Sequence, residues 1–85
     1  MMNSNKILIQ IYLPLFEEEY DVFVPINKRI GTIKQLFEKS IVEQNSNYKI
    51  REDTNFYSRD TGKVLDVQLL VKDSELKNGS RVILF

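Results

Sequence analysis

Apolar side chains alternate with other residues near both ends of the chain, a pattern typical of β-strands with one buried face. A first strand is predicted over 7–13, and its inward side chains are expected to be Ile7, Ile9, Ile11 and Leu13. A second strand is predicted over 20–24, before Pro25, and the short separation favours a hairpin. The last residues, 81–85, alternate again after an Asn78-Gly79 turn and predict the final strand.

Between these strands, one segment has the spacing of an amphipathic helix. Its apolar positions are Ile33, Leu36, Phe37 and Ile41, and its charged positions, expected elsewhere on the helical wheel, are Lys34, Glu38, Lys39 and Glu43. Thr32 and Gln35 have the spacing of a capping box, so the helix is predicted to begin at Thr32, with Ile30 packed beneath the first turn. Turn-forming residues at 45–47 predict its end.

The segment after the helix predicts only short elements. A strand is expected over 55–58, a turn at 59–62, a second short strand over 63–66 and a helical turn at 73–76. Whether Phe56 or Tyr57 faces inward stays open. A hairpin cannot bury its apolar face alone, so the helix must cover the sheet. We therefore predict an α+β fold, a ubiquitin-like β-grasp with a mixed sheet wrapped on one main helix, as a single domain over 1–85 with a flexible N-terminus at 1–6.

Charge and composition exclude several classes of function. Lys+Arg and Asp+Glu number 12 each, so no general field attracts nucleic acid or an anionic membrane. The chain has no cysteine and no histidine, which excludes disulfides, ordinary zinc sites and Ser-His or Cys-His nucleophiles. We expect no catalysis, no cofactor and no metal. No apolar run has the length of a membrane helix and no signal peptide is evident, so no membrane insertion and a cytoplasmic location are expected.

The order of residues in two regions is similar to that of a known family. The stretch 20–25, followed by Ile30 and the predicted helix, resembles the corresponding part of the YukD-like family of bacterial ubiquitin-fold proteins. The last region is also similar, through Leu76, Asn78-Gly79, Arg81, Val82 and Leu84. The resemblance covers 6–85 and is weaker between 48 and 70. It implies a ubiquitin fold and a small cytosolic accessory of type VII (WXG-type) secretion that acts through protein contacts. Since the sequence ends on a strand, without the Gly-Gly tail of a conjugated modifier, we expect no conjugation.

Period-two alternation also predicts which side chains point away from the helix. The expected protein-contact residues on this outer face are Leu8, Tyr12, Phe23, Arg81, Ile83 and Phe85. An apolar patch of this kind is typical of an interface, although an ordinary protein surface is also largely apolar. Glu17-Glu18-Glu19 is interpreted as a solvated acidic turn rather than a site for a basic partner.

Two other functions stay open from the sequence. The first is a structural homo-oligomer, in which the apolar face and an unpaired edge strand meet their own copies. The second is a sulfur carrier or modifier with a processed C-terminus. The sequence names neither the partner nor the oligomeric state, and it does not show whether the chain is part of a longer protein.

Overall fold

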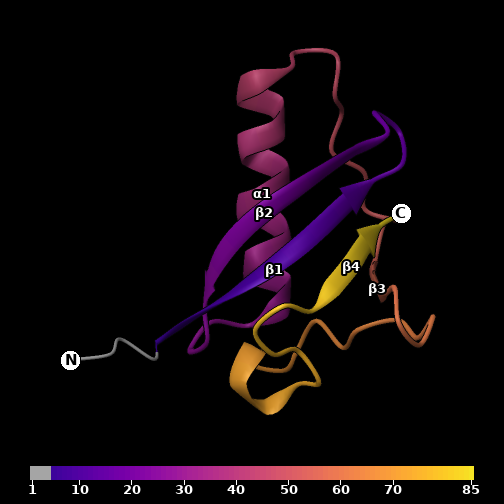
Figure 1. Ribbon diagram of the computed structural model, residues 1–85. Helices are drawn as coiled ribbons and strands as arrows, with labels where there is room; N and C mark the ends of the chain where they lie inside the picture. The colour runs from indigo at the N-terminus through magenta and orange to yellow at the C-terminus, as the bar shows by residue number, and fades with distance from the viewer. Residues whose placement is uncertain (1–4) are drawn as a thin grey trace.

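The computed structural model describes residues 5–85 and has one mixed four-stranded sheet with one main helix. The elements are β1 (Lys6–Leu13), β2 (Glu18–Pro25), α1 (Ile30–Gln44), β3 (Phe56–Ser58), the 3-10 helix η1 (Val71–Asp73) and β4 (Arg81–Leu84). The strand order is β2-β1-β4-β3, with β1 antiparallel to β2 and parallel to β4. Figure 1 shows α1 behind the β1–β2 hairpin, so one face of the sheet is covered. The predicted α+β β-grasp architecture is confirmed.

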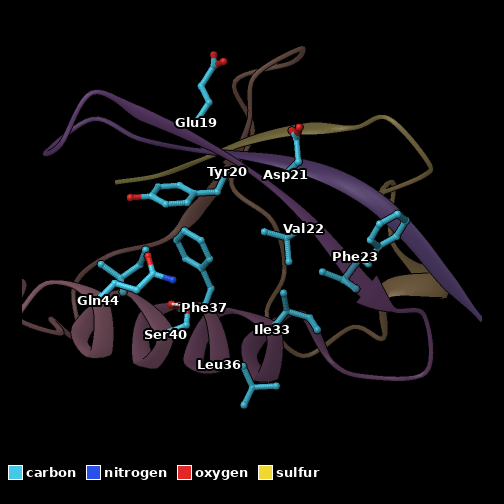
Figure 2. Close-up of a pocket in the computed structure, with 12 residues that line it drawn as sticks. Glu19, Tyr20, Asp21, Val22, Phe23, Ile33, Leu36, Phe37, Ser40 and Gln44 are labelled. Atoms are coloured by element: carbon cyan, nitrogen blue, oxygen red, sulfur yellow. Dashed lines mark hydrogen bonds between the residues drawn. The ribbon is translucent and has the colours of Figure 1, made fainter.

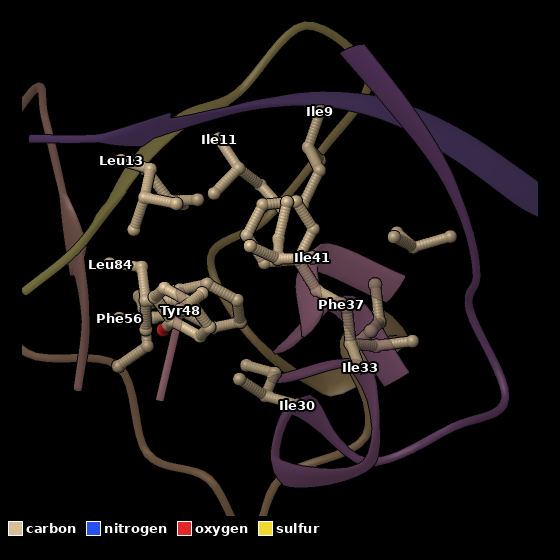
Figure 3. Packing of buried hydrophobic residues seen from close by; sticks show 14 residues of the cluster. Ile9, Ile11, Leu13, Ile30, Ile33, Phe37, Ile41, Tyr48, Phe56 and Leu84 are labelled. Carbon is tan, nitrogen blue, oxygen red and sulfur yellow. The ribbon is translucent and has the colours of Figure 1, made fainter. Parts of the chain in front are cut away.

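The core lies between the sheet and α1, where alternation on the strands meets helical spacing (Figure 3). It contains the inward residues of β1 and β4 and the apolar stripe of the helix: Ile9, Ile11, Leu13, Val82, Leu84, Ile33, Phe37 and Ile41. The open question on β3 is settled by burial. Phe56 is only 1% exposed and packs in the core, whereas Tyr57 is half-buried on the opposite side.

The start of α1 differs from the prediction. The helix begins at Ile30 rather than Thr32, and no side chain caps it. Instead, the N–H of Ile30 donates to the carbonyl of Leu69 at 2.9 Å, and the N–H of Gly31 donates to that of Val67 at 3.0 Å. These carbonyls satisfy free donors of the first turn, which is the task that a capping hydroxyl would perform. The capping-box prediction at Thr32 is therefore wrong.

Gly31 explains how the 67–69 segment comes so close to the helix. A Cβ atom at this position would lie 3.2 Å from the Val67 carbonyl oxygen, closer than about nine in ten real Cβ contacts. The absence of a side chain therefore allows a backbone carbonyl to act as the cap.

The predicted short strand at 63–66 does pair back, but it forms a single bridge between Tyr57 and Val64 rather than a strand. The N–H of Leu65 donates to the carbonyl of Phe56 at 2.8 Å, and pairing stops there because the chain turns away to cap α1. The helical turn predicted at 73–76 lies earlier in the chain, as η1. Its end is fixed by Ser74, whose hydroxyl donates to the Val71 carbonyl at 2.7 Å.

At the N-terminus, the prediction of a flexible segment over 1–6 falls mainly outside the described residues. Lys6, its last residue, is the first residue of β1. The second strand is longer than predicted, because Glu18 and Glu19 of the acidic cluster belong to β2 and not to the turn.

Two helical side chains are placed differently from the prediction. Leu36, expected in the core, is 57% exposed, whereas Glu38, expected on the solvated side, is 1% exposed. Glu38 accepts a hydrogen bond from the Lys34 ammonium at 2.9 Å and another from the Tyr48 hydroxyl at 3.0 Å. The chain after α1 folds back over this side of the helix, and Thr54 reaches the same carboxylate at 3.4 Å.

This buried cluster also affects Tyr48. Burial, helped by the hydrogen bond to Glu38 and the charge of its carboxylate, raises the pKa of the Tyr48 hydroxyl to about 12. Because all its polar groups have partners inside the domain, the cluster fixes the 45–55 segment to the helix and offers no free group for chemistry.

Candidate protein-interaction surface

Beyond the terminal pair of Lys6 and Pro25, the outer face of the sheet, opposite α1, carries its side chains in three cross-strand rows. The register places Phe23 beside Leu8 in the first row. The second row contains Asp21, Gln10 and Arg81, and the third contains Glu19, Tyr12, Ile83 and Tyr57. Five of the six predicted contact residues therefore belong to this face by register. The sixth, Phe85, follows β4 with the same alternation.

The first row provides a small apolar cluster at one end of the face. Phe23 is 68% exposed, on an edge strand, and Leu8 beside it is half-buried. The Leu8 N–H is held by the Asn78 side chain, which accepts it at 2.8 Å, and this bond ties the turn before β4 to β1. Phe23 is thus a large aromatic side chain that the fold presents to solvent without using it in the core.

The second row is polar and separates the apolar clusters. Arg59, which follows β3, extends its guanidinium over β4 and β1, donating to Gln10 at 3.3 Å and to Glu19 of β2 at 3.1 Å. The same guanidinium lies 5.3 Å from the centroid of the Tyr12 ring. An arrangement of this kind combines an exposed ion pair with a cation–π contact.

Arg81 has a local partner as well. Its guanidinium donates to the Asp60 carboxylate at 2.7 Å, with both side chains about half exposed. The predicted outer-face residues are therefore not one continuous apolar patch, because a band of paired charges crosses the middle of the face.

Tyr12, Ile83 and Tyr57 of the third row, together with Phe85, form the second apolar cluster. Ile83 is half-buried between Tyr12 and Tyr57, and Phe85 is 73% exposed. Beside them is a hollow of about 510 Å³ whose lining includes Leu15, Tyr57 and Phe85. An exposed aromatic side chain beside a concave site, flanked by half-buried aromatic rings, is typical of the central residues of protein interfaces.

Sequence reasoning missed Arg59, Tyr57 and the Arg81–Asp60 pair on this face. The sequence at 59–62 predicts only a turn, and no periodic signal shows that the Arg59 side chain extends over two strands. The outward position of Tyr57 depends on the register of β3, which the short apolar run in the sequence does not determine.

Residues 5–85 contain no group of three or more His, Cys, Asp or Glu side chains able to hold a metal ion. Within the same range, no helix is both long and apolar enough to cross a membrane.

Comparison with solved structures shows that the fold is that of ubiquitin-like domains. The fold is similar to a ubiquitin-like domain of an Arabidopsis thaliana protein, with TM-score 0.70, 17% identity, and coverage of 100% of this chain and 81% of that one. It is also similar to ubiquitin from Caldiarchaeum subterraneum, with TM-score 0.67, 12% identity, and coverage of 93% and 90%.

A third similar structure is a chain of the MycP5-free ESX-5 inner membrane complex. The TM-score is 0.74 at 10% identity, and the match covers 96% of this chain but only 21% of that chain. At such low identities these likenesses show the fold alone. No protein-family model and no curated protein matches the sequence.

Proposed function

We propose that this chain is a non-catalytic ubiquitin-like protein-interaction module, a small cytosolic accessory of type VII secretion. The observation that carries the first part is the outer face, where Phe23 and Phe85 are exposed and unused by the core. Two likenesses support the secretion role: the resemblance of 20–25 and 76–84 to the YukD-like family, and the structural similarity to part of the ESX-5 complex.

The proposed contacts are the six outer-face residues, in two clusters: Leu8 and Phe23 at one end, and Tyr12, Ile83 and Phe85 at the other, with Arg81 between them. The band of paired charges selects orientation rather than supplying most of the affinity, because exposed ion pairs contribute little. A partner that covers both clusters would bury the exposed aromatic rings and meet charges of both signs between them.

The test starts from the genes beside this one. Neighbouring genes that encode WXG-type substrates and a membrane ATPase would support the proposal. The chain is then co-expressed with a tagged form of that ATPase, and the amount that co-purifies with the ATPase is measured. Phe23→Asp and Phe85→Asp are expected to lower co-purification at least about tenfold, since each buries a charge at the interface. Ile50→Asp, which changes a side chain 56% exposed on another part of the surface, is the matched control.

Two results would reject the proposal. One is normal co-purification of both phenylalanine variants, which would exclude the outer face as the contact surface. The other is a neighbourhood that encodes an adenylating enzyme or a deconjugating protease, together with a processed end in the intact mass, which would favour a carrier or modifier. Sedimentation that depends on concentration would favour the homo-oligomer.

A further inference from the structure

Strand β2 forms one edge of the sheet, and every second residue of it directs its backbone groups away from β1. In β1, the N–H of Gln10 donates to the Ser80 carbonyl at 2.9 Å, and the carbonyl of Leu8 accepts from the Gly79 N–H at 2.7 Å. The backbone N–H and C=O groups of the even-numbered residues of β1 therefore point toward β4. The odd-numbered residues must then bond to β2, through Tyr20, Val22 and Val24. Backbone groups therefore point outward from the edge at Glu19, Asp21 and Phe23, without a backbone partner within residues 5–85.

A groove of about 480 Å³ runs along the same edge, between β2 and α1. Figure 2 shows Tyr20 and Val22 pointing from the strand toward the helix, while Glu19 and Asp21 point to the opposite side. The Tyr20 and Phe37 rings pack edge to face, with centroids 5.3 Å apart, and make an apolar floor. The groove is open because β2 has no further strand beside it, so these inward side chains stay only half-buried.

The charged residues of β2 itself are all acidic, and one of them, Glu19, already accepts a hydrogen bond from the Arg59 guanidinium at 3.1 Å. Among the described residues that line the groove, Glu19 and Asp21 are charged and no lysine or arginine is present. Glu18 lies one residue earlier on β2, and neither it nor Asp21 forms an ion pair within residues 5–85. An added strand would place its inward side chains over Tyr20 and Val22, and its outward side chains beside Glu19 and Asp21.

We infer that the β2 edge and this groove bind an extended segment of another protein, with aliphatic residues at every second position and lysine or arginine between them. The unpaired backbone groups of the edge supply hydrogen bonds, the groove accepts the aliphatic side chains, and the carboxylates pair with the cations. The inference concerns a different surface from the two outer-face clusters and does not depend on the secretion role.

A second copy of this chain fits the edge poorly. Antiparallel pairing of two β2 strands around Asp21 would set carboxylate against carboxylate on the outer side, and the acidic residues before Asp21 would add to the repulsion in a parallel pair. Like charges directly opposite each other destabilise a strand pair. A basic partner segment meets no such penalty.

The test uses two synthetic peptides as long as the eight-residue strand β2. One alternates valine with lysine and the other alternates valine with glutamate. Each is titrated into the isotope-labelled chain at low salt, and amide shifts are followed by NMR. The lysine peptide is expected to shift amides of β2 and α1 and to slow hydrogen exchange at Asp21 and Phe23, while the glutamate peptide binds at least about tenfold more weakly.

Two variants locate the site. Ser40→Arg, which places a long cation in the groove, is expected to weaken the lysine peptide about tenfold, whereas Gln35→Arg, exposed on the same helix outside the groove, leaves it unchanged. Asp21→Lys is expected to reduce or reverse the preference between the two peptides. Equal binding of both peptides, no binding at millimolar concentration, or shifts confined to Tyr12, Ile83 and Phe85 would each overturn the inference.

Discussion

The buried Glu38 carboxylate makes the Lys34→Met substitution the most informative test of how this fold is stabilised. The substitution keeps helix propensity and most of the apolar stem, so the lost ammonium is the main change. It leaves a carboxylate 1% exposed without its ion-pair partner at 2.9 Å. Removing one member of a buried pair costs about 3–5 kcal/mol. Because the Tyr48 hydroxyl still donates to Glu38, we expect the lower end, about 3 kcal/mol.

The assay is unfolding in urea, read by circular dichroism, with Lys39→Met as the matched control. Lys39 is an exposed lysine on the same helix, so its loss should change stability by less than about 0.5 kcal/mol. The double variant Lys34→Met/Glu38→Gln should be more stable than the sum of the single changes predicts, since it removes the unpaired charge. If Lys34→Met unfolds at the same urea concentration as the control, the buried carboxylate is not paired as described.

Three further variants test other features of the fold. Stability should fall as pH rises from the ordinary tyrosine pKa of 10.0 toward about 12, because the native state keeps Tyr48 protonated while the unfolded state loses that proton. In Tyr48→Phe this contribution to the pH dependence should be missing. The free energy of unfolding measured at about pH 9 and about pH 11 checks it. Gly79→Ala should cost about 1 kcal/mol in urea unfolding, because Gly79 has φ +91. Thr32→Ala should change stability by less than about 0.5 kcal/mol; a loss typical of a cap would contradict the observed helix start.

The long elements of the fold were predictable because their patterns depend on local periodicity. The alternation at 7–13 and the spacing of Ile33, Phe37 and Ile41 each required burial on one side, and the structure provides it. The start of α1 was not predictable, since its first donors bond to carbonyls nearly forty residues away, at Leu69 and Val67. Glu38 was misplaced for the same reason: its burial depends on a segment that folds back over the helix.

The outer-face residues were predictable as a group but not as a surface. The alternation of side chains along β1, β2 and β4 predicts that Leu8, Phe23 and Ile83 lie on one face, and the observed register agrees. The continuity of the patch depends on Arg59, a side chain from a loop that crosses the sheet to reach Glu19. The groove was also invisible to pattern reasoning, because it requires knowing that β2 is an edge strand and how far α1 lies from it.

The two proposed surfaces meet at β2, but variants that lie away from this strand can separate them. Phe23 contributes its side chain to the outer face and its backbone to the free edge, so Phe23→Asp is expected to affect both. Phe85 lies beyond β4, far from the edge in strand order, and Ser40 lies on the helix side. Phe85→Asp should therefore weaken co-purification with the ATPase and leave the valine–lysine peptide bound normally, while Ser40→Arg should do the reverse. If both variants weaken both interactions, the two surfaces are one site, and the division drawn through β2 is wrong.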